Sequence, residues 1–176
     1  MKRFLVIVDM QKDFVDGALG SKEALAIVPP AAEKIKSFPG TIIATFDTHF
    51  EDYLTTAEGA KLPVPHCIFG TDGWQLDAGI AKALEGKSFI PVKKRTFGSV
   101  DLPHIIASCA LNEAFSIELI GLCTDICVVS NALLLKAAFP EAPIIVDAAC
   151  CAGVTPAAHE AALATMRSCQ IDVING

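Results

Sequence analysis

The sequence predicts a three-layer α/β/α sandwich with a mostly parallel, roughly six-stranded, Rossmann-like sheet. Short runs rich in valine and isoleucine are continuous rather than alternating, which is typical of strands buried on both faces. Stretches with helical spacing separate these runs, and such alternation forms right-handed crossovers between parallel strands. The length of 176 residues suits one core, so we expect a single domain over residues 1–176.

The expected elements follow one another along the whole chain. Strands are expected at 4–8, 41–46, 89–92, 115–121, 142–147 and 171–175, and helices at 22–37, 75–85, 101–111, 125–139 and 156–170. Pro29 and Pro30 should split the first helix into two pieces, because proline removes a backbone donor and crowds the preceding turn. The longest irregular stretch is 47–74, and a loop of that length in a compact domain is usually functional.

Composition and charge exclude several classes of partner. Hydrophobic residues make up 52% of the chain, which excludes a disordered protein, and the formal charge of -6 argues against nucleic acid or anionic membrane as a partner. The most apolar stretch, 114–139, holds Glu118, Asp125 and Lys136, which would be costly in lipid. Asp9 interrupts the first apolar run, so we expect a strand there rather than a signal peptide. We therefore expect a cytoplasmic protein with reduced cysteines.

Reactive side chains follow four of the expected strands. Asp9 follows the first strand, Asp47 and His49 follow the second, Lys94 follows the third, and the segment 123–127 follows the fourth. Ligands of open α/β sheets bind beyond the carboxyl ends of the strands, where these residues would meet. The sequence therefore predicts a functional site at this edge of the sheet.

Cys127 is the candidate nucleophile within the segment that follows the fourth strand. Thr124 or Asp125 is expected to cap the helix that begins there. Cys127 then lies in the first helical turn, where backbone amides favour a thiolate and could receive an oxyanion. Alternatively, Cys127 is one more buried core cysteine, or pairs with Cys123 in a metal or redox site. Cys123, at the strand end, is more typical of core packing.

Asp9 and Lys94 favour the catalytic interpretation of Cys127. A carboxylate at the end of a buried strand is costly unless it is paired or used, although Asp9 could also be a turn residue. Lys94 could be a solvated surface charge, and its neighbours Lys93 and Arg95 leave open which of the three points inward. We assign Asp9 as the proton-transfer partner of Cys127, with Lys94 supporting both.

The loop at 47–67 contains a second cluster of candidate ligands. Asp47 and His49 are two residues apart after a strand, and His66 lies in a proline-flanked turn. One carboxylate with two imidazoles suits zinc, iron(II) or manganese. The alternative is a polar surface loop with a turn-forming Asp-Thr-His sequence.

Three motifs resemble those of the isochorismatase-like cysteine hydrolases, the superfamily that contains nicotinamidases. They are DMQKDF at 9–14, KRTFGS at 94–99 and GLCTDICV at 121–128, and the resemblance runs from residue 4 to about 175. The resemblance implies that Asp9 transfers the proton, Cys127 attacks a carboxamide to form a thioester, and Lys94 holds Asp9 ionised. It also implies a cis peptide at Cys123–Thr124, which would turn local amides of this segment toward the oxyanion.

The same resemblance implies a divalent metal, with zinc expected first and iron or manganese as alternatives. Nicotinamidases bind this metal through residues matching Asp47, His49 and His66, with a further histidine or glutamate. Glu58 is the best-placed candidate for that last position, and the fallbacks are Glu51 and Asp52. In nicotinamidases the metal orients the pyridine nitrogen of the substrate, whereas isochorismatases proper work without it. The cluster therefore favours the nicotinamidase branch.

One position departs from the nicotinamidase pattern. Nicotinamidases usually carry an aromatic residue three positions before the last histidine, and here that position is Pro63. Phe14 would supply one aromatic wall of the substrate pocket, and the other would come from Phe97 or Trp74, although both are equally typical of a core. The substrate is therefore expected to be nicotinamide or a related small carboxamide.

Two other functions stay open at this point. One is a hydrolase of a different small amide, ureide or vinyl ether on the same scaffold, and the other is a silent thiol or metal sensor. The apolar run at 133–140 is a candidate interface of a homo-oligomer. His104 and His159 are more typical of capping or surface residues than of ligands. Cys150 and Cys151 are expected to be reduced and to border the site.

Overall fold

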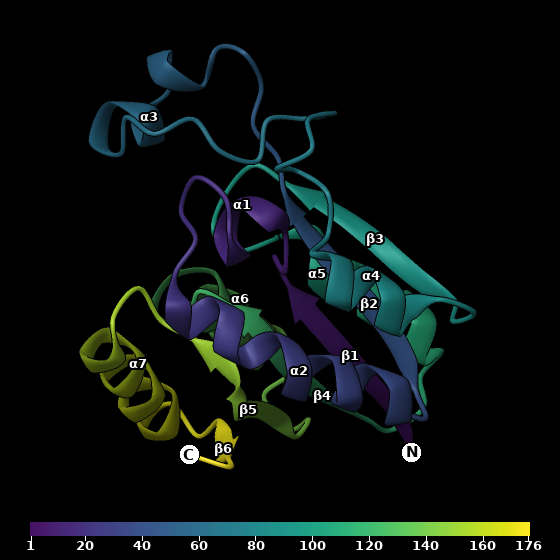
Figure 1. Ribbon diagram of the computed structural model, residues 1–176. Helices are drawn as coiled ribbons and strands as arrows, with labels where there is room; N and C mark the ends of the chain where they lie inside the picture. The colour runs from purple at the N-terminus through teal and green to yellow at the C-terminus, as the bar shows by residue number, and fades with distance from the viewer.

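The computed structural model describes residues 1–176 and contains a six-stranded sheet in which every neighbouring pair of strands is parallel. The strand order is β3-β2-β1-β4-β5-β6 (Figure 1). The strands are β1 (Lys2–Val8), β2 (Thr41–Asp47), β3 (Phe89–Lys94), β4 (Phe115–Leu122), β5 (Ile144–Ala152) and β6 (Asp172–Ile174). All six expected strands are present, and the α/β prediction is confirmed.

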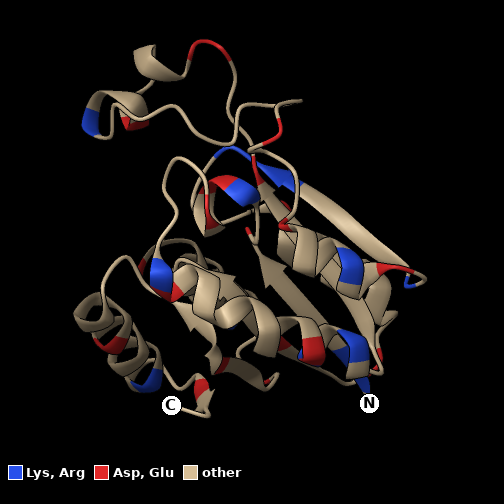
Figure 2. Cartoon of the chain, in the orientation of Figure 1, with Lys and Arg blue, Asp and Glu red and all other residues tan.

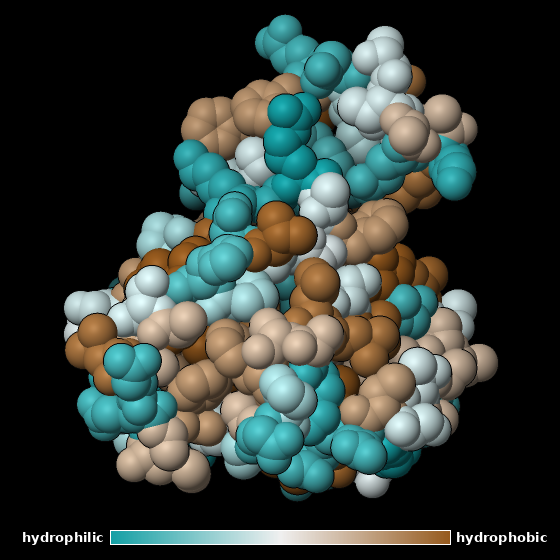
Figure 3. Space-filling view, turned by 180° about the vertical axis from the view of Figure 1, so that it is seen from behind, coloured by the Kyte–Doolittle hydropathy of each residue, from teal (hydrophilic) through white to brown (hydrophobic).

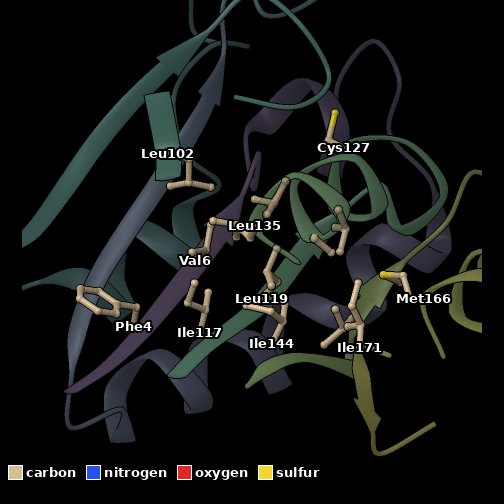
Figure 4. Packing of buried hydrophobic residues seen from close by; sticks show 14 of the residues in the cluster. Phe4, Val6, Leu102, Ile117, Leu119, Cys127, Leu135, Ile144, Met166 and Ile171 are labelled. Carbon is tan, nitrogen blue, oxygen red and sulfur yellow. The ribbon is translucent and has the colours of Figure 1, made fainter. Parts of the chain in front are cut away.

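Helices cover both faces of the sheet, because the strands are apolar on both sides. The longer helices are α2 (Lys22–Ser37), α4 (Ala78–Leu84), α5 (Asp101–Ala110), α6 (Val129–Ala138) and α7 (Pro156–Ser168). Helices α2 and α4 pack with one face of the sheet in a first apolar cluster. Helices α5, α6 and α7 pack with the other face in a second cluster, part of which Figure 4 shows. The sheet is therefore the middle layer of three.

Helix α2 is continuous through Pro29 and Pro30, so the expected split into two pieces is wrong. Each proline deprives the carbonyl four residues earlier of its donor, and these carbonyls belong to Leu25 and Ala26. Both residues are exposed, so water can satisfy the two carbonyls. The helix begins at the cap residue Ser21, whose hydroxyl accepts a hydrogen bond from the Ala24 amide at 3.0 Å.

The segment between β2 and α4 projects beyond the carboxyl ends of the strands (Figure 1). It contains a 3-10 turn at Tyr53–Thr55 and the short helix α3 (Ala57–Lys61), whereas the short helix α1 (Lys12–Val15) lies directly after β1. Basic residues gather where β3 ends at this same edge (Figure 2). Both chain termini lie at the opposite end of the molecule (Figure 1). The fold thus leaves the carboxyl edge to side chains that can perform chemistry.

The surface mixes polar and apolar side chains (Figure 3). Several large hydrophobic residues are exposed, among them Phe50, Phe69 and Phe97 near the projecting segment. None of the helices combines the length and apolar character needed to cross a bilayer.

Candidate active site and metal centre

The positively charged side chain of Lys94 lies at the centre of the site. It is the last residue of β3, and its ammonium nitrogen lies 2.6 Å from Oδ2 of Asp9, 3.3 Å from Oδ1 of Asp47 and 3.6 Å from Sγ of Cys127. Its neighbours Lys93 and Arg95 are exposed, so Lys94 is the member of the basic run that points inward. The structure thus brings together four residues that the sequence placed at one edge.

Asp9 is fully buried and held in an unusual backbone conformation. Its φ angle of 48° lies in the left-handed region, which non-glycine residues rarely adopt. The Thr45 hydroxyl donates to Oδ1 of Asp9 at 2.6 Å and accepts from the Asp9 amide at 3.1 Å. Together with Lys94, this contact from the neighbouring strand β2 fixes the carboxylate.

Cys127 lies in a π-helical turn, Thr124–Val128, that connects β4 to α6. The cis peptide is at Leu122–Cys123, one residue earlier than expected, so it directly follows the last residue of β4. Figure 4 shows Cys127 at the end of its apolar cluster, with the sulfur directed away from the cluster. The candidate nucleophile thus lies where a packed helix meets the open edge of the sheet.

Neither Thr124 nor Asp125 caps this turn with its side chain, contrary to expectation. The Thr124 hydroxyl instead bonds Nδ1 of His159, on α7, at 2.8 Å, and Oδ1 of Asp125 accepts from the Val154 amide at 3.0 Å. The turn is therefore held by the segment after β5 and by α7. His159 has a defined partner next to the site, which its helical position alone did not reveal.

Burial sets the protonation of the thiol. Burial, reinforced by the negative charge of Asp9, raises the pKa of Cys127 well above its ordinary value, and burial also raises the pKa of Asp9. Burial opposes the charged form of Lys94 as well, but the negative charges of Asp9 and Asp47 and the hydrogen bond to Asp9 outweigh it and raise the pKa of Lys94. The expected preference for a thiolate is thus reversed, and a neutral thiol lies beside an ion pair.

The second cluster comprises two carboxylates and two imidazoles. Asp47, His49, Glu58 and His66 each offer one ligand atom, and these atoms lie within 4.8 Å of one another. Nε2 of His49 is 3.0 Å from Oδ2 of Asp47 and 3.6 Å from Oε1 of Glu58, and Nε2 of His66 is 3.6 Å from the Asp47 oxygen. The two fallback positions, Glu51 and Asp52, are exposed and lie outside the cluster.

The chemistry of this donor set fits a divalent metal. Nδ1 of His66 can only donate to the Val64 carbonyl, 2.8 Å away, so Nε2 is the ring nitrogen that faces the carboxylates and would become a metal ligand once it gives up its proton. Although burial opposes it, hydrogen bonding from His49 and His66 holds the pKa of Asp47 well below its usual range. Tyr53 packs edge-on against both imidazole rings, at 4.6 and 5.1 Å between centroids. Such a preset mixture of nitrogen and oxygen donors suits zinc, iron(II) or manganese.

Both clusters border one cavity of about 370 Å³. Asp47, His49, Glu58 and His66 form the candidate metal-binding group. Cys127 and Cys123 line the cavity together with three of its members, Asp47, Glu58 and His66. Its remaining wall is largely apolar and includes Phe14, Leu19, Leu62, Phe97, Leu122, Ile126 and Val154. The thiol and the metal-binding group therefore face the same space.

Some residues that were expected to line this cavity do not do so. Trp74 does not line it, because its ring packs against Phe46 and Phe69 and its Nε1 donates to Thr48 at 3.0 Å. Leu62, rather than Pro63, contributes to the wall just before the His66 turn. Cys150 and Cys151 are free thiols, as expected, but neither lines the cavity.

Two residues of the first motif contact the metal-binding segment and were not predicted to do so. Gln11 is fully buried and bonds the main chain of Asp47, whereas Asp13 accepts from the amide of Cys67 at 2.7 Å. Their partners are backbone groups more than thirty residues away, so no pattern in the sequence could have revealed these contacts. The one local signal was a polar residue, Gln11, two positions after Asp9 at the end of a strand expected to be buried, which could have suggested a structural role.

A family model, the isochorismatase domain, matches residues 3–176 of the chain. The chain belongs to the isochorismatase family. The fold of this family member is shared by a nicotinamidase/pyrazinamidase from Bacillus subtilis, at 26% identity and a TM-score of 0.84, over 98% of this chain and 99% of that one. A pyrazinamidase/nicotinamidase from Streptococcus mutans is also 26% identical, with a TM-score of 0.83 over 98% and 100% of the two chains.

A pyrazinamidase from Pyrococcus horikoshii, whose structure is a complex with zinc, shares the fold at 23% identity. Its TM-score is 0.80, and the match covers all of both chains. None of the curated proteins is similar enough in sequence to match this isochorismatase-family chain. The family and its structural neighbours establish a hydrolase, whereas the substrate has to be argued from the site.

Proposed function

We propose that this isochorismatase-family hydrolase is a metal-assisted cysteine amidohydrolase, and that nicotinamide is its best-supported substrate. The proposal depends on one observation: Cys127 and the metal-binding group line the same cavity, and Lys94 contacts both Cys127 and Asp47. A carboxamide in that cavity can meet a nucleophile at one end and a cation at the other. The reaction is hydrolysis of the amide to a carboxylate and ammonia.

Asp9 is the proposed proton carrier. The neutral Cys127 thiol transfers its proton to the Asp9 carboxylate as sulfur attacks the carbonyl carbon. Asp9 then returns the proton to the amine as the carbon–nitrogen bond breaks, leaving a thioester and ammonia. Water activated by Asp9 cleaves the thioester, giving the acid and restoring the thiol. Burial raises the pKa values of both groups, so neither is trapped in its charged form between steps.

Lys94 and the turn before α6 stabilise the charges that develop. Lys94 contacts Asp9 and the sulfur simultaneously, so its positive charge balances whichever of them holds the negative charge. The turn from Cys123 to Cys127 supplies the candidate backbone amides for the oxyanion, and Thr124 and Asp125 are fixed by their contacts with His159 and Val154. Each negative charge that develops on Asp9, on the sulfur or on the oxyanion therefore lies next to Lys94 or a candidate backbone amide.

Asp47, His49, Glu58 and His66 are the proposed ligands of the metal, with zinc the first expectation. When bound, a divalent cation there supplies a Lewis-acidic point that holds a nitrogen of the substrate and orients it. The chain itself contributes the rigid ligand set and the apolar wall formed by Phe14, whose ring lies 5.4 Å from that of His66. Together they restrict how the ring of a carboxamide can lie.

The cavity favours an uncharged substrate. The side chains that line it include no lysine or arginine, and its charged members are the acidic ligands Asp47 and Glu58. A substrate that carries a carboxylate away from the metal, such as an N-carbamoyl amino acid, would bring that charge against the apolar wall, where no cationic side chain can pair with it. Phe14, Phe97 and Ile126 instead suit the faces of a planar heteroaromatic ring.

Ammonia release from nicotinamide tests the proposal, with the wild type and Cys127→Ala assayed in the presence of zinc. We expect turnover by the wild type and a loss of at least about a thousandfold in Cys127→Ala, because the covalent route is removed. Cys151→Ala is the matched control, since Cys151 is 4% exposed, like Cys127, and belongs to the same apolar cluster. It should keep most of the activity.

The same assay separates the alternatives. An active Cys127→Ala variant would refute the thioester route. A wild type that releases no ammonia from nicotinamide but hydrolyses another small amide would leave the hydrolase proposal intact and reject the substrate. A wild type that is alkylated at Cys127 but turns over no amide would favour a sensor.

A further inference from the structure

Gln11 forms a bridge between the first strand and the metal-binding segment. Its side-chain carbonyl accepts from the Asp47 amide at 2.8 Å, and its side-chain amide donates to the Asp47 carbonyl at 2.9 Å. The same amide donates to the Trp74 carbonyl at 2.8 Å. Gln11 thus uses three hydrogen bonds to hold the backbone of Asp47 beside the backbone of Trp74. These two residues lie at opposite ends of the loop 47–74, which contains the candidate metal ligands.

Asp13 makes a second bridge to the same segment. Its Oδ2 accepts from the amide of Cys67, the residue after His66, at 2.7 Å, and its own amide donates to the Gly73 carbonyl at 3.0 Å. A Cβ at Gly73 would lie 2.2 Å from Oδ2 of Asp13, so only glycine allows the carboxylate to lie there. Cys67 itself has a φ angle of 46°, an uncommon conformation that needs support from its surroundings.

The two bridges reach opposite sides of the metal-binding group. One fixes the backbone of Asp47 and the other fixes the residue next to His66, and both start from the short stretch that also contains Asp9. Neither side chain belongs to the group of ligand atoms. The distance between the Asp47 and His66 ligand atoms is therefore set by residues 11–13 and not by the projecting segment alone.

We propose that Gln11 and Asp13 are positioning residues that preset the metal-binding group for a divalent cation. The inference rests on the metal site of the proposed function but on no assumption about the substrate. Hydrogen bonds that position metal ligands commonly account for a ten- to hundredfold difference in metal affinity. Loss of either bridge should therefore weaken zinc binding while leaving the sheet and its two apolar clusters in place.

The test is the zinc affinity of the full chain, measured by competition with a chromogenic chelator. Asp13→Ala and Gln11→Leu should each bind zinc about ten- to a hundredfold more weakly than the wild type. Asp13→Asn keeps an oxygen that can accept from the Cys67 amide, so it should recover most of the affinity. Asp72→Ala is the control, because Asp72 is exposed and pairs only with Lys12.

Thermal unfolding in chelator checks that each variant is folded without metal. If Asp13→Ala fails to fold, Gly73→Ala replaces it, since the added methyl group displaces the Asp13 carboxylate without removing it. If Gln11→Leu fails to fold, Gln11→Glu replaces it, since it keeps the acceptor for the Asp47 amide and loses the two donated hydrogen bonds. Folded variants that bind zinc as tightly as the wild type would overturn the inference and leave the metal site standing. A wild type that binds no zinc would instead reject the metal site of the proposed function.

Discussion

Asp9 has two opposing effects on Cys127, and they can be separated experimentally. Its carboxylate is the proposed proton acceptor, yet its negative charge is one reason why the pKa of the thiol is raised. Asn in its place would keep the size of the side chain and remove both the base and the charge. Turnover and thiol ionisation should then change in opposite directions.

We therefore predict that Asp9→Asn lowers kcat for ammonia release by roughly 10² to 10⁴. At the same neutral pH, the rate at which iodoacetamide alkylates Cys127 should rise, because Lys94 then faces the thiol with Asp47 as its one competing carboxylate instead of two. Mass spectrometry of the Cys127 peptide follows the alkylation, and Asp72→Asn serves as the control. A variant that loses turnover and also becomes less reactive toward iodoacetamide would contradict the assigned role of Asp9.

At the level of single residues, the sequence was informative where a side chain acts on another side chain at a strand end. Asp9 and Lys94 could be predicted as site residues because each lies at the end of a buried strand. The spacing of Asp47 and His49 predicted the cluster that the structure brings together. Their catalytic and ligand roles stay predictions. The sequence did not predict the contacts that Gln11, Asp13 and His159 make in the site, because these residues bond groups on segments far along the chain. Such partners follow from tertiary packing and leave no local pattern.

One ionic cluster links helix α2 to the sheet, away from the cavity. Lys34 of α2 forms ion pairs with Glu118 of β4 and Asp147 of β5. Both carboxylates are buried, whereas the Lys34 side chain is 22% exposed. Asn175, near the C-terminus, donates to Asp147 at 3.0 Å. The ammonium group of Lys34 is therefore the main positive charge that stabilises the buried carboxylates of Glu118 and Asp147 on neighbouring strands.

We predict that Lys34→Met lowers the free energy of unfolding by roughly 3 kcal/mol, at the low end for breaking a buried ion pair because the lysine keeps some contact with water. Urea unfolding measures the change. Lys36→Met is the control on the same helix, because its pair with Glu33 is exposed and such pairs contribute about 0 to 1 kcal/mol. Equal losses in the two variants would show that the buried carboxylates do not depend on Lys34.

The contribution of Lys34 should also depend on pH in a defined direction. Burial opposes its charge, but hydrogen bonds to Asp147 and Glu118 outweigh burial and raise its pKa above the unfolded value. The stabilisation is therefore complete below the unfolded pKa of about 10.4 and disappears as the pH rises through the folded pKa. The stability difference between wild type and Lys34→Met should stay constant from pH 7 to 9 and shrink in stronger alkali. A difference that shrinks below pH 9 would contradict this.

At the level of elements, apolar runs predicted the strands because a strand buried on both faces has to be apolar throughout. The split of α2 was predicted wrongly because the cost of Pro29 and Pro30 depends on whether water reaches two carbonyls, which only the packed helix shows. The π-helical turn before α6 was missed for a similar reason. Its geometry depends on contacts of Thr124 and Asp125 with α7 and the segment after β5.

Across the whole molecule, the parallel sheet followed from the alternation of strands and helices, but the strand order did not. That the chain forms a single domain stays a prediction, although all six strands share one sheet. The stretch from Asp47, the last residue of β2, to His66 supplies all four members of the candidate metal-binding group, and Gln11 and Asp13 connect it to the end of β1. Metal binding in this segment should therefore stabilise more than a local loop.

We predict that zinc raises the melting temperature of the full chain. A ligand that binds only the folded state stabilises it by about 2.7 kcal/mol at a hundred times its Kd. For a domain of this size, that corresponds to roughly 5 to 10 °C. Differential scanning calorimetry with and without zinc measures the shift. The matched pair of variants is His66→Ala, which removes a proposed ligand, and His104→Ala, which removes an exposed histidine on α5.

His66→Ala should lose most of the zinc-dependent shift, whereas His104→Ala should keep it. Comparing the shift within each variant cancels any change that the substitution makes to the metal-free protein. A full shift in His66→Ala would place the stabilising zinc elsewhere, with the seven free cysteines as the first alternative ligands. Because zinc bound to cysteines of the unfolded chain would lower the melting temperature instead, the sign of the shift also reports which state the metal prefers.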